Sequence, residues 1–119
     1  MIKMTMFLKR KAGMSHEDFV KHHIEVHGPK FRSIPEAQTH CRRYIQTHPV
    51  ELKTDAAQNA NFDGTAELWF DSEDGMHAVL TSDTYQNVVF PDEKTFLDHN
   101  NTLIIVGEQG EIIGDFREG

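Results

Sequence analysis

Histidine gives this sequence most of its capacity for chemistry. The chain has eight histidines among 119 residues, and an imidazole titrates close enough to neutral pH to act as an acid or a base. His27 is the first candidate, because it ends a predicted helix on the same stripe as Phe19 and His23. A helix C-terminus favours its charged form, whereas a dry pocket favours its neutral form. We therefore expect His27 to exchange protons with a ligand, or else to cap the last helical carbonyls.

His23 precedes His27 by four residues, so the two imidazoles share one helix face. We expect His23 to be a second catalytic residue, and either His23 or Glu67 to orient His27. The same spacing suits two zinc ligands, and Glu67 or His48 would have to supply a third. Packed imidazoles are the commoner use of such a pair, so we predict no metal site. His22 lies off the stripe and is predicted to face solvent.

Three polar side chains alternate along a predicted strand, where one face carries Tyr44, Gln46 and His48. A phenol can donate to a carbonyl or to an oxygen that gains negative charge, so Tyr44 is a third catalytic candidate. Gln46 and His48 would then contact the substrate. The alternative is that this face lies in a partly hydrated subunit contact, where tyrosine is also common.

Glu67 stands in the middle of another predicted strand, where an unpaired charge would be costly. It either pairs with a cation such as Arg43 or is tuned by burial for acid–base work, which makes it the fourth catalytic candidate. Trp69 could stack on an aromatic substrate, although a core tryptophan is the commoner outcome. The remaining predicted substrate contacts are the phenylalanines Phe19, Phe90 and Phe96. Their first expected role is core packing, and their second is to form part of the pocket wall.

Alternation of apolar and polar residues predicts strands over Ile2–Lys9, Cys41–His48 and Gly64–Phe70, because successive strand side chains point to opposite faces. The continuous apolar run Leu103–Val106 predicts a fourth, buried strand. The segment Val50–Asn61 is small and polar and predicts a surface loop.

Helical spacing of apolar and aromatic residues predicts a first helix over His16–His27, with Ser15 and Asp18 resembling a capping box. Gly28 and Pro29 are predicted to end this helix, since proline cannot continue one.

A second helix is predicted over Glu73–Leu80, with Asp71 or Ser72 as its cap. Helical spacing continues over Asp83–Asp98, which Pro91 is predicted to split. The order is therefore β-α-β-β-α-β, typical of the α+β ferredoxin-like fold with a four-stranded antiparallel sheet. One domain over residues 1–119 is expected, because two domains would each be too small to bury a core. The sheet face without helices carries apolar residues, so we expect a second copy to cover it and form a homodimer.

Composition excludes several classes of protein. The net charge is −7 and the only cysteine is Cys41, so no intrachain disulfide is expected, and neither is a nucleic-acid partner. No apolar run reaches the roughly 18 residues of a membrane span, and the N-terminus lacks the pattern of a signal peptide, so a cytoplasmic protein without membrane partners is expected. Phosphate loops, dinucleotide fingerprints and nucleophile elbows are absent from the sequence.

Three segments, KRKAGMSHEDFVKHHIEVHGP, RRYIQTH and FDGTAELWFDS, resemble in order and spacing the hallmark stretches of the EthD family. The resemblance covers Ile2 to about Val106 and implies a dimeric α+β barrel with one pocket per subunit. It also implies action on small cyclic or aromatic molecules without metal or organic cofactor, as in muconolactone methylisomerases and fungal polyketide dehydratases and decarboxylases. The family's His-x-Pro element reads His27-Gly28-Pro29 here, whereas His23 stands where many relatives have Trp or Tyr.

The expected function is a cofactor-independent lyase or isomerase, of dehydratase or cyclase type, acting on a small cyclic or aromatic carbonyl compound. In this hypothesis His27 moves a proton next to the carbonyl and Tyr44 hydrogen-bonds the oxygen that gains charge. Two alternatives use the same pocket. One is a non-catalytic protein that binds a hydrophobic metabolite or assists an oxidative degradation system, and the other is a cofactor-free monooxygenase.

Overall fold

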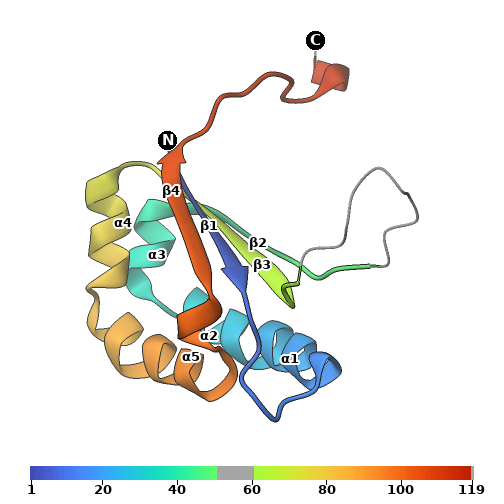
Figure 1. Cartoon of the computed structure of the whole chain (residues 1–119). Helices are drawn as coiled ribbons and strands as arrows, with labels where there is room; N and C mark the ends of the chain where they lie inside the picture. Colours follow the sequence, from blue (N-terminus) through green and yellow to red (C-terminus); the bar gives the residue numbers. More distant parts are fainter. Residues whose placement is uncertain (51–60, 119) are drawn as a thin grey trace.

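The computed structural model describes residues 1–50 and 61–118 (Figure 1). Its centre is a four-stranded antiparallel sheet in the order β2-β3-β1-β4. The strands are β1 (Ile2–Leu8), β2 (Cys41–Thr47), β3 (Gly64–Phe70) and β4 (Leu103–Glu108). The predicted α+β ferredoxin-like order is confirmed, and strand ends differ from the predictions by two residues at most. The loop predicted over Val50–Asn61 lies almost wholly outside the described residues.

The helices lie on one face of the sheet (Figure 1). Between β1 and β2 come α1 (His16–His22), a wide π turn η1 (His23–His27), α2 (Gly28–Arg32) and α3 (Pro35–His40). Between β3 and β4 come α4 (Glu73–Leu80), a second π turn η2 (Tyr85–Val89), α5 (Phe90–Phe96) and the short 3₁₀ turn η3 (His99–Asn101), and a last 3₁₀ turn, η4, spans Phe116–Glu118. None of the helices in the described residues is long and apolar enough to cross a membrane.

The two predicted helix starts are confirmed by their caps. The Ser15 hydroxyl accepts a hydrogen bond from the Asp18 amide at 3.1 Å, and the Ser72 hydroxyl accepts one from the Gly75 amide at 3.0 Å. Each cap satisfies an amide that the first helical turn leaves without a partner. These caps fix where α1 and α4 begin over the sheet.

Both predicted helix breaks are wrong, because the helices continue through Pro29 and Pro91. A wide turn precedes each proline: the Gly28 amide donates to the carbonyl of His23, and the amide before Pro91 donates to that of Tyr85. Each bond spans five residues instead of four. A proline lacks an amide hydrogen and its ring pushes on the preceding turn, and the wider turn accommodates both effects. The sequence rule predicts a break where the structure has a local change of pitch.

The fourth strand is not buried in its own chain, which corrects the prediction. β4 pairs only with β1 and forms one edge of the sheet. Leu103 and Ile105 are exposed on the face away from the helices, where they flank Phe7 and Thr5 of β1. Beyond Glu108 the chain leaves the sheet and extends away from the rest of the subunit (Figure 1). An apolar run therefore marks an edge strand with an uncovered outer face.

Candidate functional site

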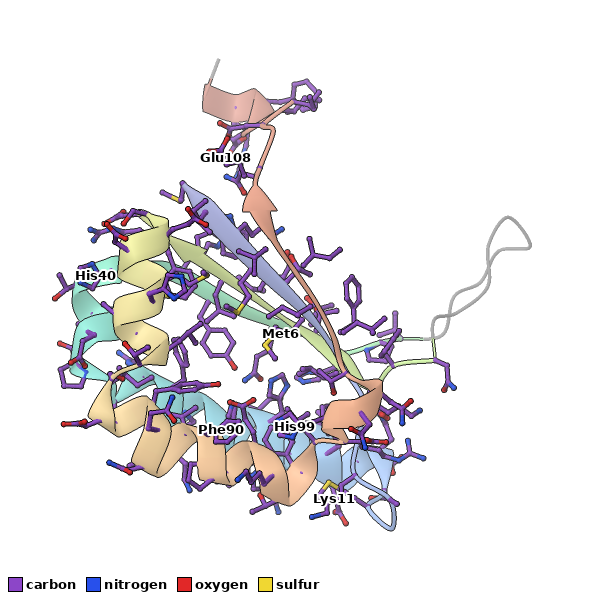
Figure 2. All side chains as sticks on the ribbon, turned by 60° about the vertical axis from the view of Figure 1, so that its left-hand side comes forward. Met6, Lys11, His40, Phe90, His99 and Glu108 are labelled. Carbon is purple, nitrogen blue, oxygen red and sulfur yellow. The ribbon has the colours of Figure 1, made fainter. Side chains whose placement is uncertain are left out.

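A cavity of about 120 Å³, the inner pocket, lies between the sheet and the helices. Figure 2 shows Met6 in this space, between the strands and the helical layer. Most of its wall is apolar, and the polar side chains come from η1, β2, η2 and α5. The lining residues are Met4, Met6, Leu8, His23, His27, Phe31, Tyr44, Ala66, Leu68, Leu80, Tyr85, Val89, Glu93, Phe96, Leu97 and Ile104.

The carboxylate of Asp92 in α5 contacts His27, which lines this pocket, and two further groups that are cationic or can become so. Nδ1 of His27 and Nε2 of His22 each lie 2.9 Å from its oxygens, and Nζ of Lys30 lies at 3.6 Å. His22 and His27 are five residues apart and would diverge on a regular α-helix. The wide turn η1 brings them to the same side. The prediction that His22 faces solvent is therefore wrong.

Burial and the carboxylate of this cluster act on the pKa of His27 in opposite directions, and burial has the larger effect. Burial raises the pKa of Asp92, but the hydrogen bonds from His27 and His22 more than offset it, so the net pKa is below its usual value. Burial lowers the pKa of His27 by more than Asp92 raises it. Near neutral pH the carboxylate is ionised and accepts a hydrogen bond from Nδ1–H of a neutral His27. Its Nε2 then carries a lone pair, which is the form of a general base.

His23 is the second histidine of the pocket wall and is only 1% exposed. Its Nδ1 lies 2.9 Å from Nε2 of His48, just beyond the end of β2. Burial, with the neighbouring His48, His27 and His22, lowers the pKa of His23 to about 3, so the ring is neutral. Among the described residues, its Nε2 is the one fully buried side-chain polar atom without a hydrogen-bond partner.

Tyr44 presents a phenol to the same pocket. Nε2 of Gln46 donates to the Tyr44 oxygen at 2.9 Å and to the carbonyl of His23 at 2.8 Å. Burial raises the pKa of Tyr44 to about 12, so its hydroxyl keeps the proton and can donate it in a hydrogen bond. Gln46 does not line the inner pocket but an open groove beside α2, so it braces Tyr44 and η1.

A hydrogen-bonded pair of a phenol and a carboxylate, Tyr85 and Glu93, also lines the pocket. The Tyr85 hydroxyl donates to Glu93 Oε2 at 2.6 Å, and both residues line the cavity. Burial and the adjacent Glu93 raise the pKa of Tyr85. Glu93, which the sequence analysis missed together with Asp92, is buried beside it. The two acids follow Pro91 and look like ordinary residues of a helix start, so only their position relative to η1 distinguishes them.

Glu67 and Trp69 lie on the opposite face of the sheet and do not meet His27. Glu67 pairs with Lys3 rather than with Arg43, at 2.5 Å between Nζ and Oε2. Lys3 and Arg43 both lie over the Trp69 ring. The expectation that Glu67 orients His27 is corrected, because strand alternation separates its side chain from the pocket. Asp92 occupies that orienting position instead.

The predicted phenylalanines divide into three positions. Phe96 lines the pocket and its ring centroid lies 4.9 Å from that of His27. Phe19 is fully buried behind it, 5.4 Å from Phe96, in the core rather than the lining. The Phe90 ring lies near those of Tyr85 and His99, with centroids 6.3 and 5.9 Å away (Figure 2), and does not line the pocket.

In the described residues, no three His, Cys, Asp or Glu side chains are grouped to hold a metal ion. The two histidines considered as zinc ligands already use Nδ1, with Asp92 for His27 and with His48 for His23.

Residues 11–100 match the EthD domain family, which confirms the resemblance found in the sequence. Decarboxylase nsrE of Aspergillus novofumigatus is 26% identical over 115 residues, covering 89% of this chain and 76% of that protein.

Solved structures share the fold. An EthD family protein from Bacillus halodurans superposes with a TM-score of 0.71 at 18% identity, covering 92% of this chain and 99% of that one. A dimeric ferredoxin-like protein from Thermobifida fusca gives a TM-score of 0.66 at 15% identity, covering 91% of this chain and 90% of that one.

Proposed function

The chain belongs to the EthD family, and from this premise and the inner pocket we propose that it is a cofactor-independent lyase or isomerase. The substrate class is a small cyclic or aromatic carbonyl compound. One observation carries the proposal: His27, fixed by a buried carboxylate, shares a mostly apolar cavity with the phenol of Tyr44. Such a cavity admits a ring, while the polar groups select a carbonyl.

In the proposed reaction, Nε2 of His27 takes a proton from an acidic position of the bound substrate. The electron pair left behind moves onto the carbonyl oxygen, where Tyr44 donates a hydrogen bond. The imidazolium then returns the proton to another atom of the substrate, or to a leaving group as it departs. A positioned base contributes about 10²–10⁴ in rate and an oxyanion donor about 10²–10³. Asp92 holds the tautomer and stabilises the transient imidazolium.

Decarboxylation is the version favoured by the similar protein named as a decarboxylase. The substrate carboxylate would leave as CO₂, with its bonding electrons held by the conjugated carbonyl. The neutral His27 would first take the proton of the substrate's carboxylic acid at Nε2, and the resulting imidazolium would then give that proton to the ring carbon. The cavity of about 120 Å³ is comparable to the roughly 150 Å³ that holds benzene in an engineered apolar cavity. The expected substrate therefore presents one ring to the inner pocket.

A binding or accessory protein is the alternative, and the mostly apolar wall supports it. Against it stands the convergence of His27, Tyr44 and Glu93 on one small cavity, since a carrier of hydrophobic ligands needs no such acid–base set. The oxygen-using alternative predicts O₂ uptake, which an oxygen electrode measures.

A panel of monocyclic keto acids, lactones and hydroxylated aromatic acids tests the proposal. CO₂ release and deuterium incorporation from D₂O are followed by mass spectrometry and NMR. His27→Ala and Asp92→Asn should lower turnover by about 10²-fold or more, whereas His77→Ala, on the exposed side of α4, should not change it. Full turnover by folded His27→Ala would overturn the mechanism. Binding without turnover by the unaltered protein across the panel would favour the accessory role.

We also propose that two copies of the chain pack outer sheet face to outer sheet face. Leu103 and Ile105 are 56% and 61% exposed there, and Phe7 lies beside them. A second copy related by a two-fold axis would bury these side chains. The Thermobifida fusca protein of the same fold is described as dimeric, which supports this assembly.

A further inference from the structure

We propose that His23 and His48 form a two-imidazole proton relay, which carries protons between the inner pocket and the solvent beside the C-terminal end of β2. The relay deepens the proposed function and rests on it for its use in turnover. Its physical basis is a single hydrogen bond that joins a fully buried ring to a half-buried one.

The hydrogen bond allows two tautomeric arrangements. Nδ1 of His23 and Nε2 of His48 are 2.9 Å apart, and two neutral rings at this distance share one proton. If His48 donates, His23 carries its proton on Nε2. If His23 donates, its Nε2 has a lone pair. Because Nε2 has no partner in the protein, a ligand group in the pocket would meet either a donor or an acceptor.

Three neighbouring elements hold the two imidazole rings in contact. Gln46 of β2 donates to the His23 carbonyl at 2.8 Å, which ties η1 to the strand that leads into His48. Gly64 of β3 leaves the space that the His48 ring occupies, since a Cβ there would lie 3.0 Å from its Cδ2. The two imidazole planes are nearly perpendicular, at 87°. The contact therefore depends on three separate elements of the fold.

The relay balances without any change in the charge of the protein. Nε2–H of His23 passes its proton to the ligand, the shared proton moves from His48 Nε2 to His23 Nδ1, and His48 Nδ1 takes a proton from water. The pair is then in its other tautomer, with a lone pair on His23 Nε2. A proton taken from the ligand reverses all three transfers and returns one to water. An enzyme that removes one proton and adds another would use both directions.

Burial and the neighbouring histidines both favour the neutral form of His23 and His48. Burial lowers the pKa of His48, and His16 lowers it further. His16 itself lies 2.9 Å from the buried carboxylate of Asp63. On the inner side, His23 faces His27 and His22, which are both held by Asp92. No carboxylate contacts either ring of the relay in the described residues, so nothing there traps a proton on it.

Exchange of the His23 Nε2 proton with water tests the relay without a substrate, because a water molecule in the pocket can replace the ligand as the group that takes the proton from Nε2. The protein is labelled with ¹⁵N-histidine and the exchange rate is measured by NMR. In His48→Gln the amide can still hydrogen-bond Nδ1 of His23 but cannot pass a proton on, so exchange should slow by roughly 10²-fold. His77→Gln is the matched control and should exchange as the unaltered protein does. An unchanged rate in folded His48→Gln would overturn the relay.

A second measurement needs no variant. The ¹⁵N shifts of His23 in the unaltered protein should be averages of the two tautomers, because the relay interconverts them when pocket water takes the place of the ligand at Nε2. A single fixed tautomer, with one fully protonated nitrogen, would also overturn the relay. Neither measurement involves turnover, so a failed relay leaves the His27 proposal in place. Unchanged turnover in His27→Ala would refute the proposed role of His27. The relay would still be tested by the exchange rate of the His23 Nε2 proton.

Discussion

Acidification should destabilise this protein through His23 before the carboxylates are protonated. Burial and the neighbouring histidines lower the pKa of this ring to about 3 in the folded protein. In the unfolded chain the same side chain binds a proton near pH 6.5. Between these two values the unfolded state carries a proton that the folded state lacks, so the free energy of unfolding falls as pH falls.

The size of the effect follows from linkage. Each pH unit inside this window costs about 1.4 kcal/mol for one such group. Going from about pH 7.5 to about pH 4.5 therefore removes about 3 kcal/mol through His23 alone. His27 adds a loss of the same sign, because its pKa is also lowered. Asp63 and Asp92 have pKa values below the usual 3.8, so their stabilisation is lost only at lower pH.

Urea unfolding followed by fluorescence of Trp69, the single tryptophan, measures this loss at the two pH values. Protein concentration is held constant, because assembly would shift apparent stability. The His23→Phe variant should lose about 3 kcal/mol less than the unaltered protein over the same interval, whereas His77→Phe should keep the full loss. Equal losses in His23→Phe and the unaltered protein would refute a neutral, buried His23.

Three further predictions concern other parts of the structure. Asp92→Asn should destabilise the fold by about 1.5–3 kcal/mol at neutral pH, because hydrogen bonds to a charged group are lost. It should also lower the pKa of His27 further. Urea unfolding and ¹⁵N NMR measure the two effects, and an unchanged His27 titration would contradict the contact between His27 and the Asp92 carboxylate. Gly64→Ala should lower the free energy of unfolding by about 1–3 kcal/mol, because the new Cβ would lie 3.0 Å from both the Thr47 carbonyl and the His48 ring. Urea unfolding measures this loss. An unaltered free energy of unfolding would mean that the His48 ring moves freely. Ile105→Asp should give monomers in light scattering, since it places a charge in the proposed interface; an unaltered mass would contradict the face-to-face assembly.

Local sequence patterns predicted the sheet well because they depend on neighbouring residues only. Period-two alternation located β3 at Gly64–Phe70, and serine caps located the starts of α1 and α4. The stripe through His23 and His27 also placed both rings on the pocket wall. Each of these inferences uses residues within one element, where backbone geometry fixes the side-chain direction.

Inferences that cross between elements were less successful. Alternation groups Glu67 with Trp69 on one strand face, but it does not say which face the helices cover. The apolar run of β4 signals burial, but not whether its own chain or a second copy provides it. Asp92 meets His27 from a helix 65 residues later, and no local pattern sets that distance.

The prolines explain why the site itself was harder to predict than its histidines. Pro29 and Pro91 look like helix ends, yet each follows a wide turn within a continuing helix. The first wide turn brings His22 and His27, five residues apart, onto one carboxylate. The second contributes Tyr85 to the pocket and leads directly into the helix that carries Asp92 and Glu93. The two wide turns, which the rule that proline ends a helix does not predict, therefore bring the acid–base groups together around the cavity. Such π turns are frequent at functional sites.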